Sequence, residues 1–164
     1  MSDFNVLSVD DCVKPKRLVT RFFIHCSASD NESPRLEGSY LAETIDQWHK
    51  QKGWNGIGYH YVIDKKGVLA TGRSLEKIPA AQGGNNVNTL AVCCHGLVKE
   101  RFTPSQLETL YQLCQHYDGL YDNRVTFHGH CEVSAKTCPV FDYKAVLMLD
   151  EVGHMQYLTD VTWV

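Results

Sequence analysis

The sequence lacks the long apolar runs, the excess of basic residues and the internal repeats that mark several classes of protein. Its longest apolar runs, at 90–94 and 145–149, are far shorter than the roughly 18 residues that a membrane-spanning helix requires. Its 16 Lys and Arg against 19 Asp and Glu give a net charge of −3. That balance disfavours binding to nucleic acid, which depends on neutralising phosphates. We therefore expect no membrane span and no nucleic-acid partner.

The first residues also lack the cationic and apolar regions of a signal peptide, so we expect cytoplasmic synthesis without one. With 164 residues, 43% hydrophobic and 21% charged, the chain has the size and composition of one globular domain. We expect a monomer. Within it we predict an N-terminal arm over 1–17, a domain over 18–150 and a C-terminal extension over 151–164. The end of that extension, 161–164, is expected to pack as a strand or to contact another protein.

Cysteine, in contrast, is abundant, but its number is odd. The chain has seven cysteines, whereas a secreted disulfide scaffold usually has an even number in a shorter chain. Cys93 and Cys94 are adjacent in an apolar run, which suits small buried side chains better than a disulfide. We expect most of the cysteines to be reduced core residues, with at least one available as a ligand or a nucleophile.

Hydrophobic patterning predicts alternating strands and helices. Leu41, Ile45 and Trp48 lie at helical spacing before Gly53, and 103–106 read as a capping box with Pro at the first helical position. Strands are expected at 18–25, 59–63, 68–71, 90–94 and 125–128, and helices at 41–53, 103–119 and 142–149. The fold class is therefore α/β (or α+β), with one central mixed sheet flanked by helices.

Residue types that bind metals follow two of these strands. His25 closes the first strand, and His130 and Cys138 lie eight residues apart in the loop after the last strand. Zinc favours such nitrogen and thiolate ligands, although this spacing matches no common zinc finger or ribbon. Three protein ligands leave a fourth position for water, as in catalytic zinc sites. Lys136 and Tyr59 are the nearby donors that could stabilise an oxyanion.

These residues belong to a longer series of motifs. In order, they are IHCSA at 24–28, QWHK at 47–50, GW at 53–54, GYHYVI at 58–63, Gly67, GR at 72–73, NTLAV at 88–92, FTPSQ at 102–106 and the segment 130–142. Together they span about residues 18–145, and their order resembles that of the zinc amidases. This family includes amidase-type phage lysozymes, peptidoglycan recognition proteins and bacterial muropeptide amidases.

The resemblance implies a central mixed sheet, one Zn²⁺ per chain and hydrolysis of the amide between N-acetylmuramic acid and L-alanine in peptidoglycan. Matching positions make His25, His130 and Cys138 the metal ligands, and Tyr59 and Lys136 the catalytic residues. Peptidoglycan or its muropeptides would be the partner, met at the cell wall after release from the cytoplasm. Some phage lysozymes of this shape also bind their phage's RNA polymerase, and no pattern in this sequence tests that partner.

Several neighbours have competing interpretations. His128 is a second candidate ligand, but it lies ten residues before Cys138 whereas the family ligand lies eight before, so we favour His130 and leave His128 a supporting role. Cys131 is expected to pack, and Glu132 to be a solvated loop charge rather than a partner of the ligands. The residues expected to have no part in the chemistry are Trp48, His49 and His60.

The chain departs from many relatives in the loop PAAQGGNN at 79–86, which commonly contacts substrate and in which they carry a histidine. Two other functions stay open. One is a cysteine hydrolase that uses Cys26 or Cys138 with a histidine, which would survive zinc removal but not alkylation. The other is a module that binds peptidoglycan without cutting it. Family members of that type typically lack the cysteine ligand, which here is Cys138.

Overall fold

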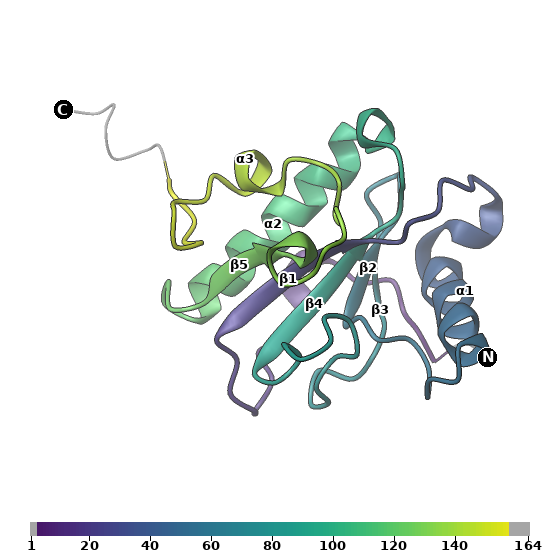
Figure 1. Cartoon of the computed structure of the whole chain (residues 1–164), viewed down its shortest axis with the longest axis horizontal. Coiled ribbons are helices and arrows are strands. Elements are labelled where there is room, and N and C mark those ends of the chain that lie inside the picture. The colour runs from purple at the N-terminus through teal and green to yellow at the C-terminus, as the bar shows by residue number, and fades with distance from the viewer. Residues whose placement is uncertain (1–2, 158–164) are drawn as a thin grey trace.

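A computed structural model describes residues 3–157 and shows five strands in one mixed sheet (Figure 1). The strands are β1 (Arg21–Cys26), β2 (Tyr61–Ile63), β3 (Leu69–Thr71), β4 (Thr89–Cys94) and β5 (Thr126–Gly129). Their order across the sheet is β3-β2-β4-β1-β5, and only the β2–β3 hairpin is antiparallel. The predicted fold class is confirmed.

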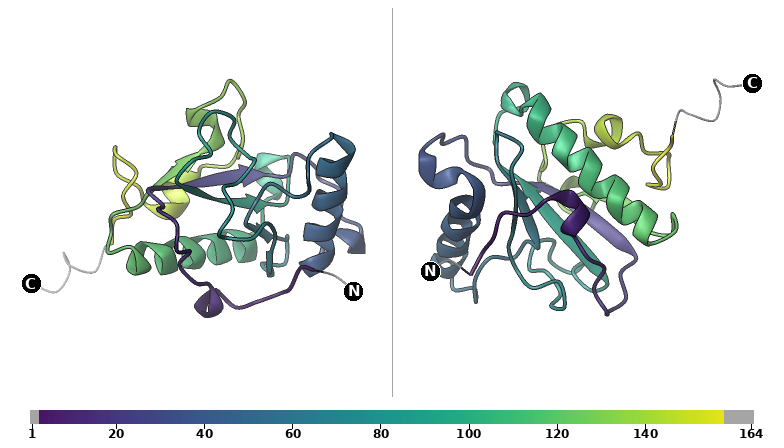
Figure 2. Two further views of the ribbon diagram at one scale, coloured as in Figure 1. Left: turned by 90° about the horizontal axis from the view of Figure 1, so that it is seen from below. Right: turned by 180° about the vertical axis from the view of Figure 1, so that it is seen from behind.

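The side chains of β1 point alternately to the two faces of the sheet. Phe22, Ile24 and Cys26 join the larger core cluster, which also contains Leu110 and Leu113 of α2 (Pro104–Leu120). Seen from behind, α2 crosses this face of the sheet (Figure 2). Successive side chains of a strand point to opposite faces, so His25 points to the other face.

That second face is only partly covered by a helix. Helix α1 (Gly38–Gln51) buries Leu41, Ala42 and Ile45 against Val62, Ala70 and Cys93. Its contacts are with β2 and β3, at one side of the sheet, and Figure 1 shows the loops before β4 and after β5 lying over the remaining strands. The end of β1 on this face is therefore left to loops rather than to a helix.

The helix signals in the sequence are confirmed. Thr103 caps α2, with Gln106 completing the capping box, and α1 ends at Gln51, two residues before Gly53, whose φ of +90° suits glycine. Several helix ends differ from expectation. Helix α1 begins at Gly38 rather than at 41, and α2 continues through Gly119 to Leu120. The last helix, α3 (Tyr143–Leu147), is shorter than the predicted 142–149 because Met148 adopts a left-handed conformation.

The cysteines are all free, and five of the seven are buried. Cys93 and Cys94 both lie within β4 with no exposed surface, as expected for small core side chains.

Among the described residues, no helix is long and apolar enough to cross a membrane. The predicted strand or contact at 161–164 lies outside the described residues.

Candidate metal centre

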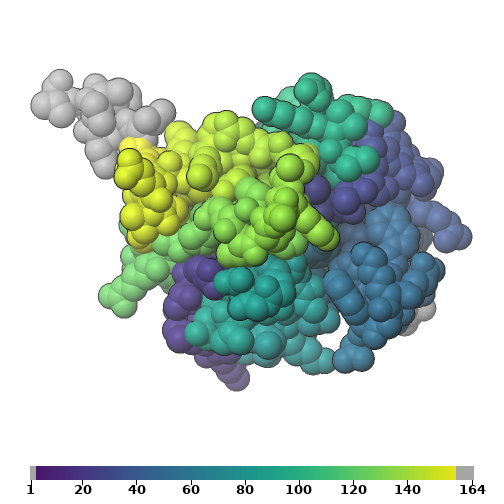
Figure 3. Space-filling view, viewed as in Figure 1, coloured from purple at the N-terminus to yellow at the C-terminus, as the bar shows by residue number. Residues whose placement is uncertain are grey.

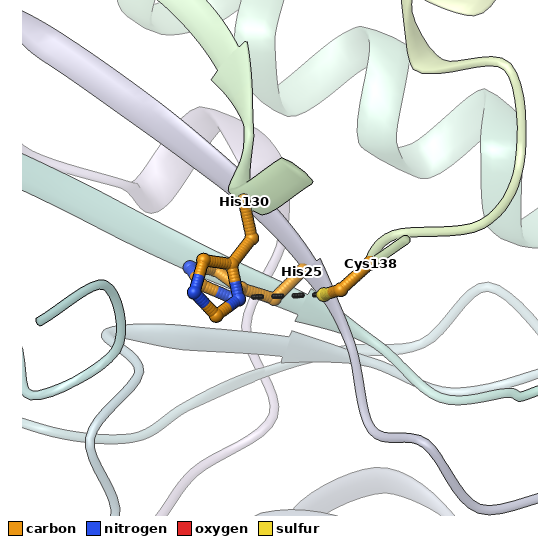
Figure 4. Close-up of side chains that lie close together, drawn as sticks. All are labelled: His25, His130 and Cys138. Atoms are coloured by element: carbon orange, nitrogen blue, oxygen red, sulfur yellow. Dashed lines mark hydrogen bonds between the residues drawn. The ribbon is translucent and has the colours of Figure 1, made fainter. Parts of the chain in front are cut away.

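Three side chains from distant parts of the sequence converge beside the end of β1. The ligand atoms of His25, His130 and Cys138 all lie within 4.8 Å of one another. Figure 4 shows them pointing together from β1, from the turn after β5 and from the loop before α3. In the described part of the chain this is the one group of three or more His, Cys, Asp or Glu residues with such spacing. The structure thus brings together the residues expected to bind zinc.

His25 is held by a partner that sequence reasoning missed. Its ring is 1% exposed, and its Nε2 lies 2.8 Å from Oε1 of Gln82, which is fully buried. Its other nitrogen, Nδ1, lies 3.8 Å from Sγ of Cys138. Burial lowers the pKa of His25 to about 3, so the ring is neutral at physiological pH. Neutral imidazole is the form that binds a metal.

His130 and Cys138 are joined by the short loop between them. The backbone N–H of Cys131 donates to the carbonyl oxygen of Cys138 at 2.8 Å, which closes the loop and turns both ligands inward. Burial, together with the nearby Lys136 ammonium, lowers the pKa of His130. A hydrogen bond with the Cys26 thiol and burial raise the pKa of Cys138, whereas a divalent cation would favour its thiolate. Two neutral imidazoles and one thiol are a donor set that suits zinc.

His128 lies outside the ligand group, and Glu132 is exposed, as expected, but it makes hydrogen bonds that were not predicted. Glu132 accepts hydrogen bonds from the backbone N–H of Gly129 and from the Tyr143 hydroxyl, and it pairs with Nδ1 of His128 at 2.9 Å. These contacts fix the turn that begins at His130, because Gly129 precedes it directly. No local pattern predicted these contacts, because a single acidic residue in a loop is usually solvated.

A cavity of about 180 Å³ opens beside His130 and Cys138. Figure 3 shows the molecule hollowed on this face between α1 and the segment that carries His130 and Cys138. The cavity is also lined by both expected catalytic residues, Tyr59 and Lys136. A larger hollow of about 670 Å³ lies between the N-terminal arm and α2, away from these ligands. The smaller cavity is therefore the candidate active site.

An aromatic wall forms one side of this cavity. It consists of Trp48, His49, Trp54 and Tyr59, with Lys52 beside Trp54. His49 packs between the rings of Trp54 and Tyr59, at centroid distances of 4.5 and 5.5 Å, and its Nδ1 accepts from the N–H of Gly58. We expected Trp48 and His49 to be packing and surface residues, but both also line the cavity. His60, as expected, points elsewhere, toward Ala91 and Lys77.

Tyr59 and Lys136 differ in burial. The Tyr59 ring packs 5.1 Å from that of His25, and burial raises the pKa of its hydroxyl, which therefore stays protonated and able to donate. Lys136 is exposed and also lines the cavity, two residues before Cys138. The two side chains can thus place a neutral donor and a cation around one reacting group.

Comparisons with known proteins agree with this geometry. A profile of the family described as N-acetylmuramoyl-L-alanine amidase matches residues 15–141. The chain belongs to this family. It is 33% identical over 137 residues to the endolysin of Enterobacteria phage T3, across 80% of this chain and 87% of that one.

Two solved structures show how other proteins of similar fold compare with this member of the amidase family. The N-acetylmuramoyl-L-alanine amidase LysCS of Clostridium intestinale is 27% identical, with a TM-score of 0.67 over 79% of this chain and 82% of that one. Drosophila peptidoglycan recognition protein SD is 25% identical, with a TM-score of 0.65 over 77% and 82%. The sheet and flanking helices are therefore those of the amidase and recognition-protein fold.

Proposed function

We propose that this chain is a zinc-dependent amidase that hydrolyses the bond between N-acetylmuramic acid and L-alanine in peptidoglycan. The observation that carries the proposal is the convergence of His25, His130 and Cys138 beside a cavity that His130 and Cys138 line. Membership in the amidase family supports the substrate class. The similarity to phage endolysins supports action at the bacterial cell wall after release from the cytoplasm.

His25, His130 and Cys138 would hold Zn²⁺ beside the cavity. Bound there, zinc supplies Lewis acidity and lowers the pKa of water to about 7. The protein's own groups then account for positioning. The protonated hydroxyl of Tyr59 would donate a hydrogen bond to the oxygen of the scissile carbonyl, and the Lys136 ammonium would stabilise the charge that develops on this oxygen. The aromatic wall and Lys52 bind the rest of the muropeptide.

Neither alternative function has comparable support. The hydrogen bond between the two thiols lowers the pKa of Cys26 to about 7 and raises that of Cys138, so only Cys26 forms a thiolate easily. Cys26, however, is 5% exposed, and its side chain belongs to the core cluster under α2. A module that only binds peptidoglycan would not need three convergent ligands beside Tyr59 and Lys136. The complete set of metal ligands favours catalysis.

The test is to measure metal content and muropeptide cleavage on one purified sample, before chelation, after chelation and after zinc is returned. We expect one zinc per chain and new L-alanine amino termini only in the zinc-loaded form. Cleavage that survives chelation but stops with iodoacetamide would establish the cysteine hydrolase instead. Zinc binding without cleavage of any peptidoglycan would establish a binding module.

A further inference from the structure

The buried hydrogen bond between His25 and Gln82 belongs to a chain of polar groups whose direction is fixed. We propose that Gln82 and Thr89 are positioning residues that hold His25 as the tautomer protonated on Nε2, so that the Nδ1 lone pair faces the metal position. The part of this inference that concerns a metal rests on the proposed function. The part that concerns the tautomer does not.

The direction is set at one end by a backbone carbonyl. Thr89 Oγ1 lies 2.8 Å from the carbonyl oxygen of Asn86, which can only accept, so the Thr89 hydroxyl must donate to it. Its lone pairs are then left to accept from Gln82, whose Nε2 lies 2.8 Å away. The amide nitrogen of Gln82 therefore faces Thr89, and its carbonyl oxygen faces His25.

A second carbonyl leads to the same orientation of the Gln82 amide. Its Nε2 also lies 3.4 Å from the backbone oxygen of Asn85, again an acceptor only. The opposite orientation would place the amide oxygen against that carbonyl and leave the hydroxyl of Thr89 with two acceptors for one proton. Because Gln82 and Thr89 are both fully buried, no water could compensate for such a mismatch.

The backbone of this loop is held as firmly as the side chain. Oδ1 of Asn86 accepts from the N–H groups of Ala81 and Gln82, at 3.1 and 2.9 Å. Asn86 thus fixes the main chain of Gln82 through its side chain and the direction of the hydrogen bonds through its carbonyl. Ala80 and Ala81 line the cavity, whereas Gln82 points inward to His25.

The consequence for His25 follows from proton counting. A neutral imidazole has one N–H, and Nε2 faces the Gln82 oxygen at 2.8 Å, so Nε2 must donate. The unprotonated nitrogen is then Nδ1, which is the one that lies 3.8 Å from Sγ of Cys138. Metal-binding histidines commonly donate their other N–H in this way, and the partner fixes both tautomer and ring orientation.

The matched variants are Thr89→Ser, which keeps the hydroxyl, and Thr89→Val, which removes it at nearly constant volume. The first readout is nitrogen-15 NMR of the histidines in the metal-free full-length chain, with His25→Gln used to assign the resonances. We expect one tautomer for His25, protonated on Nε2, in the wild type and in Thr89→Ser. Thr89→Val and Gln82→Met should give a mixture of the two. An Nδ1-protonated ring in the wild type would overturn the proposal.

The second readout is zinc affinity by competition with a chromophoric chelator. Gln82→Met should bind zinc about 10- to 100-fold more weakly, and Thr89→Val should be weakened in the same direction. Thr89→Ser should bind like the wild type. Equal affinities for all four proteins would overturn the positioning role. Failure to cleave peptidoglycan would reject the proposed function alone, because the tautomer is read without metal or substrate.

Discussion

The backbone N–H of Cys26 donates to the sulfur of Cys138 at 3.2 Å, although 112 residues separate the two in the chain. This hydrogen bond places the sulfur directly beyond the end of β1, where His25 precedes Cys26. An N–H that points at sulfur also stabilises its thiolate, the form that binds a metal. The same strand end therefore supplies one ligand and orients another.

Replacing the cysteine ligand should remove the metal. Cys138→Ser is expected to lose zinc and cleavage together, because the alcohol is a far weaker ligand than a thiolate. Cys131→Ser is the matched control: it changes a cysteine of the same loop that lies outside the ligand group, and it should keep both. Elemental mass spectrometry measures the zinc content per chain and distinguishes the Cys138→Ser variant from the Cys131→Ser variant. Full stoichiometry in Cys138→Ser would reject the ligand assignment.

Removing a donor at the cavity edge should separate metal binding from turnover. Lys136→Ala is expected to keep its zinc while kcat falls by about 10²- to 10³-fold, the usual loss for an oxyanion donor. Tyr59→Phe should act in the same direction. Lys99→Ala, which changes an exposed lysine away from the cavity, should leave kcat unchanged. Near-wild-type turnover in Lys136→Ala would exclude this lysine from the mechanism.

Buried histidines should make the metal-free protein sensitive to mild acid. Burial lowers the pKa of both His49 and His60 to about 4, so the folded chain binds fewer protons than the unfolded chain below pH 6.5. Their contribution to stability is complete above pH 6.5 and is lost as the pH falls toward 4, by about 1.4 kcal/mol per pH unit for each proton taken up.

Urea unfolding at several values between pH 7.5 and 5 measures this slope while most carboxylates remain ionised. In His60→Gln, the free energy of unfolding should fall less steeply with decreasing pH than in the wild type, by the contribution of about one proton. This difference in slope is expected even if the substitution also changes the stability at pH 7.5. A free energy of unfolding that is constant over this range would contradict the assignment of neutral buried histidines.

Loss of the Glu132 carboxylate should loosen the turn that carries His130. Glu132→Ala removes the acceptor for Gly129 and Tyr143 and the partner of His128, and we expect it to lower the free energy of unfolding by about 1–3 kcal/mol. Zinc affinity should fall as well, because the ligand is then less well oriented. Glu100→Ala, at an exposed position, is the control. Unchanged stability and affinity would show that the turn holds without Glu132.

The sequence was most informative where a local rule applies. The capping box at Thr103 and the neighbouring strands expected at 59–63 and 68–71 each depend on a few adjacent residues, and the structure contains the capping box and pairs β2 with β3. His25, His130 and Cys138 could be proposed because residues that follow strands gather at one edge of a sheet. Their convergence is the part of the site that was predicted correctly.

What could not be predicted depends on contacts between distant residues. Gln82 lies in a loop rich in Gly and Asn, and no spacing relates it to His25, 57 residues earlier. Glu132 and His49 resembled surface residues because local pattern cannot show that Tyr143 or Trp54 packs onto them. The missing information is tertiary, and it concerns the partners of the ligands more than the ligands themselves.

The 113-residue separation between His25 and Cys138 has a consequence for synthesis of the protein. The first ligand emerges from the ribosome early, but the sulfur that completes the group arrives only after all five strands have been translated. A nascent chain that has been translated past His130 but not as far as residue 138 has both imidazoles and lacks the sulfur ligand. Translation itself thus keeps the centre incomplete until the whole sheet is available to fold.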